Sequence, residues 1–287
     1  MNDILLIDNQ EVFEKYDIIT ISTQCDISDI PDRSCILFFG SHERGCDHIY
    51  NDLVTTLGYL SMKQPNKYIL LVGKTDDTIP STIDSHIPSN VIRIYANNID
   101  YVHPLIRFFP MGRDFRSKEI FSSMSSNVGL DGYNDNDRPV LCYCNYSVNT
   151  HPCRKKIYER ICEKEFMKFE HMGNFLDYRV SRTDFFKNLA TSKFIICPRG
   201  NAIDTFRFYD AVYYGCIPIV VKTNFHRQFE HLPILFLESE DEYAELSEEF
   251  LRKEYERLHH KHRVYYEELD MEWWLNNAYI DLLANVS

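Results

Sequence analysis

One stretch of the sequence, residues 194–221, combines residue types that bind an anionic ligand. An apolar run beginning at Phe194 leads into the polar turn Cys197-Pro-Arg-Gly200, and a helical pattern follows. Arg199 lies in the turn and Arg207 one turn into the predicted helix, where free backbone N–H groups and the helix dipole favour an anion. Two guanidinium groups beside a helix start suit a diphosphate better than a single phosphate.

Asp210 follows Arg207 by one helical turn and adds a carboxylate to the same stretch. A carboxylate there can accept hydrogen bonds from the hydroxyls of a ribose or of a sugar. The alternative is an ion pair between Arg207 and Asp210 on the protein surface, which would contribute little to stability. The spacing of Arg207 and Asp210 allows both roles for the carboxylate. The diphosphate hypothesis depends on Arg199 and Arg207 and not on Asp210.

Two strands and a helix are expected to position these side chains. The apolar runs that begin at Phe194 and Cys216 predict buried strands. We expect Asn201 or Asp204 to cap the helix and Gly215 to follow its C-terminal cap. The face predicted to pack inward consists of aromatic residues at helical spacing, namely Phe206, Tyr209, Tyr213 and Tyr214. The pattern is that of a parallel βαβ unit, in which ligands bind at the loop after the first strand.

This stretch resembles the signature of exostosin-like glycosyltransferases, whose pattern is a small residue, Pro-Arg-Gly, a short spacer, Asp-Thr-x-Arg-x-x-Glu-Ala and then Gly-Cys-Ile-Pro. The sequence here has Cys197-Pro-Arg-Gly-Asn-Ala-Ile-Asp-Thr-Phe-Arg-Phe-Tyr-Asp-Ala211, followed by Gly215-Cys-Ile-Pro218. It departs from the family at Asp210, where the usual glutamate is one methylene longer. By eye, the resemblance covers about residues 139–240.

The resemblance implies an α/β fold of the GT-B type, with two Rossmann-like, doubly wound domains that face each other across a cleft. It implies a sugar transferred with inversion from a nucleotide-diphosphate donor, which we expect to be a UDP-sugar such as UDP-xylose, to an oligosaccharide or glycoprotein. No metal or other cofactor is expected, because the arginines would stabilise the leaving diphosphate. The residues predicted to bind the donor are Asn145, Ser147, Arg154, Arg199, Asn201, Asp204, Thr205, Arg207 and Asp210.

Inverting transfer needs a base that takes the proton of the acceptor hydroxyl. Loops after the C-terminal ends of parallel strands line the binding crevice of such folds. Three of these loops in the N-terminal half carry acidic residues, so Glu43, Asp77 and Asp114 are unranked candidates for the base. Retaining GT-B enzymes carry a Glu-x7-Glu pattern whose corresponding phosphate-facing site is occupied here by arginine, so a retaining mechanism is the weaker alternative.

The N-terminal half alternates strand-like and helical runs, which predicts a mostly parallel sheet covered on both faces. A helix is expected over Cys46–Met62. The predicted strands of this half are Ile4–Ile7, Ile18–Ile21, Cys35–Gly40, Tyr68–Gly73 and Val91–Tyr95. We divide the chain into an acceptor domain (1–114), a linker (115–138), a donor domain (139–240) and C-terminal helices (241–287) that pack back across the domains.

The donor domain is expected to begin with a strand over Val140–Cys144 and a helix over Pro152–Phe166. Arg154 near that helix start is either a third phosphate ligand, as its match to a family position suggests, or a solvated charge. An amphipathic helix is predicted over Glu238–Arg263. Asp135-Asn-Asp137 spells a manganese-binding motif of other glycosyltransferases, but no apolar strand precedes it, which favours a linker.

Composition limits the class of partner. The net charge is −12, which disfavours nucleic acid or an anionic membrane as the main ligand. The sequence shows no apolar run that would span a membrane and no signal peptide, so we expect a cytoplasmic location. All nine cysteines are expected to be reduced thiols. These traits resemble the cytoplasmic glycosyltransferases of large DNA viruses of algae, or of bacteria that build surface glycans.

A second hypothesis is a protein of the same fold that binds a nucleotide sugar or a glycan but has lost transfer activity. It would keep the arginines and would need no base in the opposing loops. A kinase or synthetase is disfavoured because the sequence has no Gly-rich P-loop with lysine.

Overall fold

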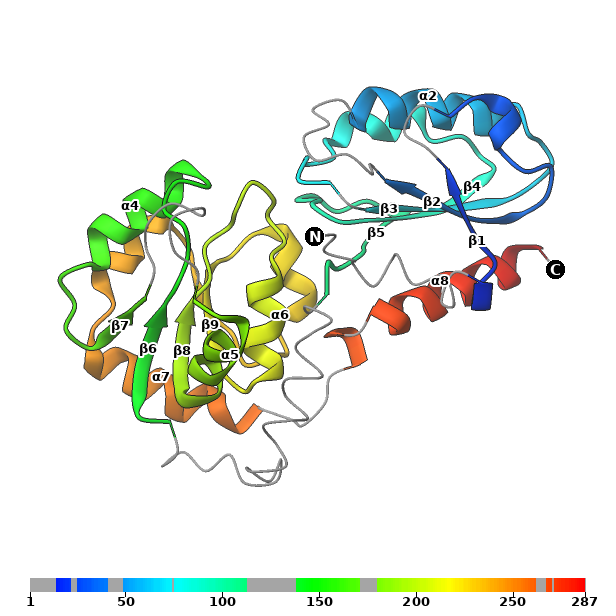
Figure 1. Ribbon diagram of the computed structural model, residues 1–287. Helices are drawn as coiled ribbons and strands as arrows, with labels where there is room; N and C mark the ends of the chain where they lie inside the picture. Colours follow the sequence, from blue (N-terminus) through cyan, green and yellow to red (C-terminus); the bar gives the residue numbers. More distant parts are fainter. Residues whose placement is uncertain are drawn as a thin grey trace. The chain divides into compact units, whose positions relative to one another are not determined.

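In the described residues, two separate parallel sheets of five strands each form the framework (Figure 1). The computed structural model describes residues 14–21, 25–40, 49–73, 75–112, 138–170, 180–261, 267–269 and 271–286. Contacts divide the chain into two units. The first unit comprises residues 1–111, 202–204 and 270–287, and the second comprises 112–201 and 205–269.

The described strands of the first unit lie side by side in chain order, β1-β2-β3-β4-β5. They are β1 (Ile18–Ile21), β2 (Cys35–Gly40), β3 (Tyr68–Gly73), β4 (Val91–Ala96) and β5 (Ile106–Phe108). Four of them confirm the predicted strands. The fifth, β5, was not predicted, because it has three residues and Arg107 interrupts its apolar pattern. The strand predicted over Ile4–Ile7 lies outside the described residues.

Helices cover both faces of the first sheet: α2 (Ile49–Ser61) lies on one face and α8 (Met271–Val286) on the other (Figure 1). Two short 3-10 helices, η2 (Ile27–Asp29) and η3 (Ser81–His86), complete the described helices of this unit. Leu275 of α8 packs in the core against the strands. Asp281 attaches α8 to β4, because its Oδ2 accepts hydrogen bonds from Tyr95 Oη (2.9 Å) and Arg93 Nε (3.1 Å).

The second unit also has a parallel sheet, but its strand order is β10-β9-β8-β6-β7. The strands are β6 (Val140–Cys144), β7 (Met167–Phe169), β8 (Ser192–Ile196), β9 (Ile217–Val221) and β10 (Leu235–Leu237). The chain adds β7 on one side of β6 and then returns to add β8 on the other side. The strand order therefore reverses between β6 and β8, as in a doubly wound sheet.

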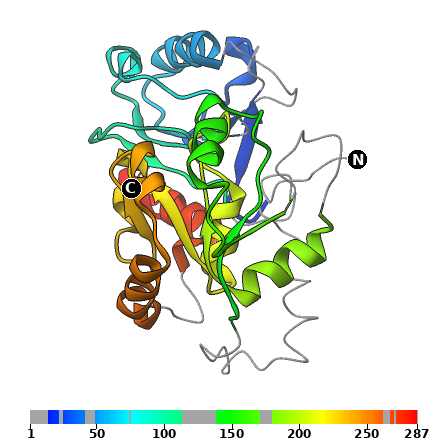
Figure 2. The same cartoon turned by 90° about the vertical axis from the view of Figure 1, so that its left-hand side faces the viewer.

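Helices on both faces cover this second sheet. They are α4 (Pro152–Ile161), α5 (Arg182–Thr191), α6 (Phe206–Tyr213) and α7 (Glu248–Leu258), with the short helices η6 (Asn224–Phe229), η7 (Glu240–Glu245), η8 (His259–Lys261) and η9 (Glu267–Leu269). Buried residues of α4 and α7 share one core cluster with the strands. Figure 2 shows α5 and α7 on opposite sides of the sheet.

Two helix predictions in this unit were too long. The helix starting at Pro152 ends at Ile161 instead of Phe166, because a turn held by Lys164 leads into β7. The Nζ atom of Lys164 donates to the carbonyls of Ala244 (2.8 Å) and Leu246 (2.7 Å).

In the described residues, the helix predicted over Glu238–Arg263 is divided into η7 and α7, and η8 follows α7 directly. Ser247 starts α7 as its N-cap, with its hydroxyl accepting from the backbone N–H of Phe250 at 3.2 Å.

Among the described helices, none has both the length and the apolar composition needed to cross a membrane. The eight cysteines in the described ranges are free thiols, and seven of them are buried. Cys46, the ninth, lies outside those ranges. Burial is the main cause that raises the pKa of Cys35 and Cys153 to about 11 and of Cys197 to about 12. These thiols therefore act as core side chains and not as nucleophiles.

Candidate functional site

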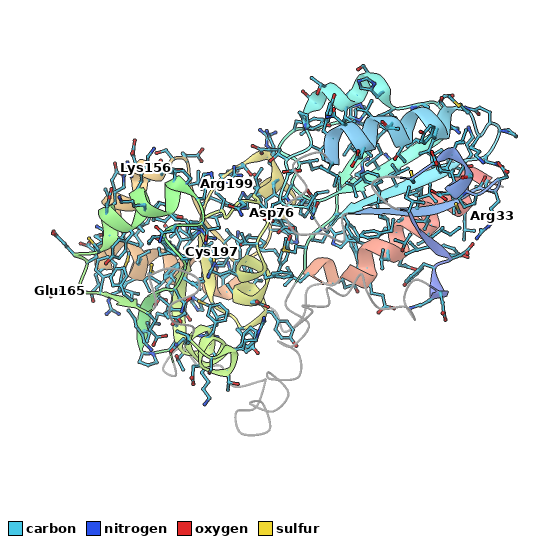
Figure 3. All side chains as sticks on the ribbon, turned by 45° about the horizontal axis from the view of Figure 1, so that its top comes forward. Arg33, Asp76, Lys156, Glu165, Cys197 and Arg199 are labelled. Atoms are coloured by element: carbon cyan, nitrogen blue, oxygen red, sulfur yellow. The ribbon has the colours of Figure 1, made fainter. Side chains whose placement is uncertain are left out.

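The arginines predicted to bind an anion lie around the point where the second sheet reverses its strand order. Residues 145–151 follow β6, and residues 197–201 follow β8, the strand beside it. In open α/β sheets, ligands bind in the crevice outside the carboxyl ends of the strands at such a reversal. The topology thus places Arg199 and the start of α4 at the position where a ligand is expected. Figure 3 labels Arg199 and Cys197 in this loop.

Arg154 of α4 ties the two loops together. Its Nε donates to the carbonyl of Arg199 (2.7 Å), its Nη1 to that of Ser147 (3.3 Å) and its Nη2 to that of Pro198 (3.4 Å). The guanidinium also lies over the ring of Tyr146, 5.7 Å from its centroid. Arg154 is only 6% exposed, so the alternative of a solvated charge at the helix start is wrong.

Gly200 packs closely against this arrangement. A Cβ atom added at Gly200 would lie 3.2 Å from Nη2 of Arg154, closer than an ordinary van der Waals contact. The glycine of the Pro-Arg-Gly turn therefore leaves room for the Arg154 guanidinium beneath the turn.

Arg207 is the second residue of α6, which begins after Thr205. Neither Asn201 nor Asp204 caps this helix, contrary to prediction: Thr205 holds the N-cap position in an extended conformation and makes no side-chain capping bond. The Arg207 guanidinium lies 5.9 Å from the ring centroid of Phe185. Its Nε is buried and has no hydrogen-bond partner among the described residues. The described structure thus leaves a donor of a charged group unsatisfied.

The electrostatics of the arginines favour an anionic ligand. Burial, and secondly the charge of Arg207, lower the pKa of Arg154 to about 10, so it stays protonated near neutral pH. In the described part of the chain no carboxylate forms an ion pair with Arg154, Arg199 or Arg207, and this includes the predicted surface pair with Asp210. Asp210 is instead buried, with 3% of its surface exposed. Buried cations without counter-charges are costly unless an anion binds them.

The remaining residues predicted to bind the donor fall into two groups. Asn145 (8% exposed) and Ser147 (9%) lie in the loop after β6, beside Arg154. Asn201 is exposed at the end of the Arg199 turn, and its carbonyl accepts from Nη2 of Arg199 at 2.8 Å. These residues belong to the second unit with the arginines, as do Thr205 and Asp210.

Asp204 is grouped differently, because residues 202–204 belong to the first unit. Its backbone N–H donates to Oδ1 of Asn98 (3.1 Å), and its Oδ2 accepts from the backbone N–H of Met111 (2.5 Å). Asn98 has a positive φ of 54° and also donates from Nδ2 to the carbonyl of Thr75 at 2.6 Å. The structure therefore assigns the carboxylate of Asp204 a contact with the loops of the first sheet.

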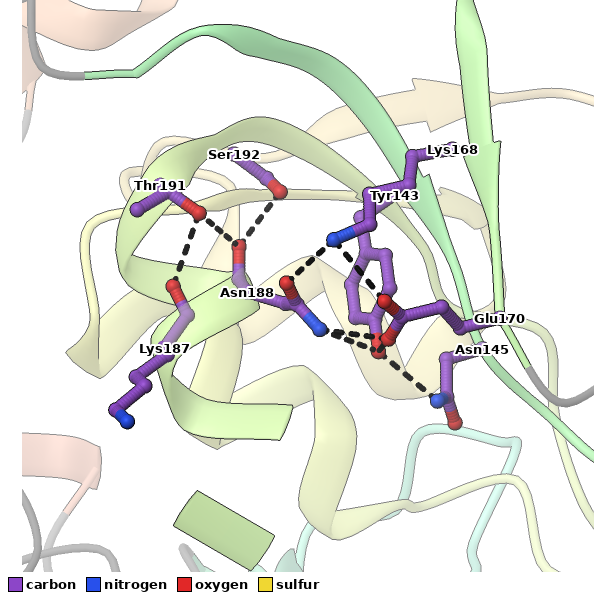
Figure 4. A network of polar contacts seen from close by, with 8 residues as sticks. All are labelled: Tyr143, Asn145, Lys168, Glu170, Lys187, Asn188, Thr191 and Ser192. Atoms are coloured by element: carbon purple, nitrogen blue, oxygen red, sulfur yellow. Dashed lines mark hydrogen bonds and ion pairs between the residues drawn. The ribbon is translucent and has the colours of Figure 1, made fainter. Parts of the chain in front are cut away.

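A network of polar side chains surrounds the end of β6, and of its members the sequence singled out only Asn145 (Figure 4). Tyr143 Oη is bonded to Glu170 Oε2 (2.9 Å) and accepts from Asn145 Nδ2 (2.9 Å). Asn188 and Lys168 complete the network. Tyr143 sits in the apolar run that predicts a strand, and Glu170 follows β7, a strand that was not predicted. No sequence signal could have joined them.

Of the three candidate bases, only Asp77 lies in the described residues. It is partly buried in the loop after β3, and its backbone N–H donates to Oγ1 of Thr75 at 2.9 Å. Glu43 and Asp114 lie outside the described residues, as does Asp135-Asn-Asp137. Within the described ranges, no group of three or more His, Cys, Asp or Glu residues is arranged to hold a metal ion. The metal-free donor site stays a prediction.

Only the last residue of the predicted linker 115–138 is described. Arg138 is 4% exposed and donates to the carbonyls of Leu189 (3.1 Å), Ser192 (2.8 Å) and Tyr214 (2.7 Å). Unlike Arg154, Arg138 precedes β6 and so lies at the opposite end of that strand from the candidate site, which makes it a structural arginine of the second unit.

Two parallel-sheet units with helices, together with candidate ligand loops at a strand reversal, are typical of an α/β protein of the GT-B class. The profile of the Exostosin GT47 domain matches residues 42–233, more than half of the chain. The chain therefore belongs to the exostosin GT47 family and is a glycosyltransferase.

The solved structures similar to this chain include a crystal structure of an α1,3-fucosyltransferase. It aligns with a TM-score of 0.52 and 11% sequence identity, covering 100% of this chain and 94% of that one. A crystal structure of α1,3-fucosyltransferase with GDP-fucose aligns with a TM-score of 0.50 and 12% identity, covering 91% of this chain and 80% of that one. These identities support the shared fold alone. A search of curated protein sequences found no significant match.

Proposed function

We propose that this glycosyltransferase takes a sugar from a nucleotide-diphosphate donor whose diphosphate binds to Arg154, Arg199 and Arg207. The observation that carries the proposal is that no carboxylate pairs with these arginines in the described structure, although Arg154 and the Nε of Arg207 are buried. A diphosphate supplies the missing negative charge and accepts hydrogen bonds from the guanidinium groups. The fold shared with a fucosyltransferase solved with GDP-fucose supports a nucleotide-sugar donor.

The arginines contribute to catalysis by stabilising charge on the leaving group. As the acceptor oxygen bonds to the anomeric carbon, the bond from that carbon to the diphosphate oxygen breaks and leaves its electron pair on the phosphate. Guanidinium groups already held beside that oxygen stabilise the developing charge without reorganisation. Attack from the face opposite the leaving group gives inversion.

Side chains around the arginines are proposed to bind the uncharged parts of the donor. Asp210, Asn201, Thr205, Asn145 and Ser147 offer acceptors and donors suited to the ribose and sugar hydroxyls. UDP-xylose is our specific candidate, and GDP-fucose is the alternative suggested by the fucosyltransferase fold. The base that takes the acceptor proton is one of Asp77, Glu43 and Asp114, and the acceptor is a glycan hydroxyl.

The proposal is tested by titrating the purified protein with UDP-xylose, other UDP-sugars and GDP-fucose, with EDTA present, and following its thermal unfolding. A ligand that binds only the folded state raises the midpoint with concentration. We expect one donor to do so, and to be hydrolysed slowly without acceptor.

Three results would argue otherwise. Binding without hydrolysis or transfer would favour an inactive nucleotide-sugar-binding protein. Binding that EDTA abolishes would restore the metal hypothesis for Asp135-Asn-Asp137. No shift with any donor, even with oligosaccharide acceptors present, would overturn the donor assignment.

A further inference from the structure

Two charged side chains, Lys168 at the centre of β7 and Glu170 directly after it, fix the direction of a hydrogen-bond network in the second unit. Lys168 can only donate, and an ionised Glu170 can only accept. Lys168 Nζ donates to Asn188 Oδ1 (2.7 Å), and Asn188 Nδ2 donates to Glu170 Oε2 (2.6 Å). Lys168 and Glu170 also form an ion pair at 3.0 Å. The amide of Asn188 therefore has only one orientation that satisfies both charges.

The fixed direction of the hydrogen bonds continues through Tyr143 to Asn145. Burial, and secondly the charge of Glu170, raise the pKa of Tyr143 far above its ordinary value, so the hydroxyl keeps its single proton. Because Glu170 Oε2, at 2.9 Å, cannot donate, that proton goes to Glu170. The hydroxyl oxygen must then accept from its other two partners, Asn145 Nδ2 at 2.9 Å and Asn188 Nδ2 at 3.4 Å. Asn145 therefore presents its NH₂ group to Tyr143.

This orientation leaves the carbonyl oxygen of Asn145 on the side away from Tyr143 (Figure 4). Oδ1 accepts no hydrogen bond from a described residue, and it is not among the polar atoms sealed from solvent. Asn145 begins the loop whose Tyr146 and Ser147 contact the Arg154 guanidinium. An unused acceptor thus lies in the loop that contacts the candidate diphosphate ligand Arg154.

We propose that Tyr143 and Glu170 are positioning residues that hold Asn145 so that its Oδ1 accepts a hydrogen bond from a hydroxyl of the nucleotide sugar. This inference rests on the proposed function, because it needs a donor bound at the arginines. The hydroxyl belongs to the ribose or to the transferred sugar. This arrangement gives specificity for the donor. A ligand with a hydroxyl at this position forms the hydrogen bond, whereas an analogue without it leaves the acceptor Oδ1 unpaired.

The orientation of Asn145 is testable without ligand by comparing Asn145→Ala with Asn145→Asp in thermal unfolding. The aspartate would place a second carboxylate on a hydroxyl whose one proton already serves Glu170. We therefore expect the unfolding midpoint to fall in the order wild type, Asn145→Ala, Asn145→Asp. A midpoint of Asn145→Asp equal to that of the wild type would mean that Oδ1 faces Tyr143, and would overturn the inference.

The role in binding is testable by titrating UDP, UDP-xylose, GDP and GDP-fucose into wild type, Tyr143→Phe, Asn145→Ala and the double variant. Losing one neutral hydrogen bond is expected to weaken binding about fivefold in each single variant. Because Tyr143 acts through Asn145, the double variant should bind no more weakly than Asn145→Ala. If the variants bind UDP or GDP more weakly than wild type does, the hydroxyl that bonds to Asn145 belongs to the ribose. If only binding of the nucleotide sugar is weakened, it belongs to the transferred sugar.

Tyr243→Phe is the matched control. Tyr243 is a fully buried tyrosine of the same unit, and its Oη donates to the carbonyl of Ile219 at 3.2 Å. Its loss should lower the unfolding midpoint without changing the dissociation constant.

Additive losses in the double variant, or a loss in Tyr243→Phe equal to that in Tyr143→Phe, would show a merely structural effect and overturn the inference. If wild type binds a probe and Tyr143→Phe binds it as tightly, the inference fails while the proposed function stands. If wild type binds none of the four probes, the proposed donor fails, and the role of Asn145 fails with it.

Discussion

Nε of Arg154 donates to the carbonyl oxygen of Arg199 at 2.7 Å, so α4 holds the turn that carries the next arginine. The bond uses a side-chain donor on a backbone acceptor, which fixes the path of the turn. Arg199 itself donates from Nη2 to the carbonyl of Asn201 at 2.8 Å. The candidate diphosphate site is thus organised before any ligand arrives, which reduces the ordering cost of binding.

Replacing Arg207 by alanine tests directly whether this arginine binds the diphosphate of the donor. Removing a charge-assisted donor to the leaving diphosphate should cost about 2–4 kcal/mol of transition-state stabilisation, which lowers kcat/KM about 30- to 1000-fold. The measurement is sugar transfer, or donor hydrolysis if no acceptor is known.

Arg252→Ala is the control for Arg207→Ala. Arg252 is an exposed arginine of α7 paired with Glu248 at 2.7 Å, and its loss should leave the rate unchanged. Wild-type turnover by Arg207→Ala would contradict the diphosphate assignment.

Gly200→Ala probes the packing of the turn on Arg154. The new Cβ would lie 3.2 Å from Nη2 of Arg154, so the guanidinium must shift. We expect the donor dissociation constant to rise several-fold, equivalent to about 1 kcal/mol. In an Arg154→Ala background the same substitution should have no further effect on binding, because the crowded group is gone.

Gly58→Ala is the comparison for this substitution. Gly58 lies in α2 with nothing within 4 Å of the added Cβ, and alanine there should stabilise the helix by about 0.5–1 kcal/mol without affecting binding. Equal effects of the two glycine substitutions on donor affinity would refute the role of Gly200.

The sequence predicted the strands with long apolar runs and missed those without them. The strand over Val140–Cys144 has its predicted bounds because β-propensity and burial agree there. Strands β5 and β7 have three residues each, with Arg107 and Lys168 at their centres. These segments form strands because they pair with neighbouring strands, and their local residue pattern does not predict it. The break at Ser247 was hidden because charged residues continue on both sides of it.

The site was predictable in its chemistry and not in its geometry. Residue types and spacing singled out Arg199 and Arg207, and a family match added Arg154. The burial of Arg154 depends on carbonyls far away in sequence, in the loop after β8. Asp204 looked like a helix cap, but its carboxylate accepts from the N–H of Met111 instead. Such choices between competing partners are made by tertiary structure.

A buried histidine gives the protein a specific pH dependence. Burial lowers the pKa of His226 from 6.5 to about 3. Its Nδ1 accepts from the backbone N–H of Thr223 at 3.2 Å, and its ring packs against Phe208, 5.8 Å away. In the unfolded chain His226 binds a proton below about pH 6.5, whereas in the folded chain it binds one only below about pH 3. The contribution of the neutral His226 ring to the free energy of unfolding is therefore fully present above pH 6.5. It is lost as the pH falls from 6.5 to about 3.

His226→Asn isolates that contribution, because asparagine keeps an acceptor for the Thr223 N–H and does not titrate. In denaturant unfolding, the stability of wild type relative to the variant should fall by about 1.4 kcal/mol per pH unit between pH 6 and 4. Other acid-sensitive groups cancel in the difference. Parallel stability curves for the two proteins would show that His226 has the same pKa in the folded and unfolded states, which would contradict the prediction.

Single replacements of Asp77, Glu43 and Asp114 test which residue takes the acceptor proton. Asp77→Asn keeps the shape of the side chain, and the turn is retained because the Asp77 backbone N–H, not the carboxylate, donates to Thr75. The variant that removes the base should lose about 10²–10⁴-fold in transfer while binding the donor as tightly as wild type. Asp84→Asn is the control, because Asp84 accepts from Tyr101 Oη at 3.2 Å in the same unit and should not affect transfer. If none of the three variants loses transfer, the proton goes to a group outside these loops or to the substrate itself.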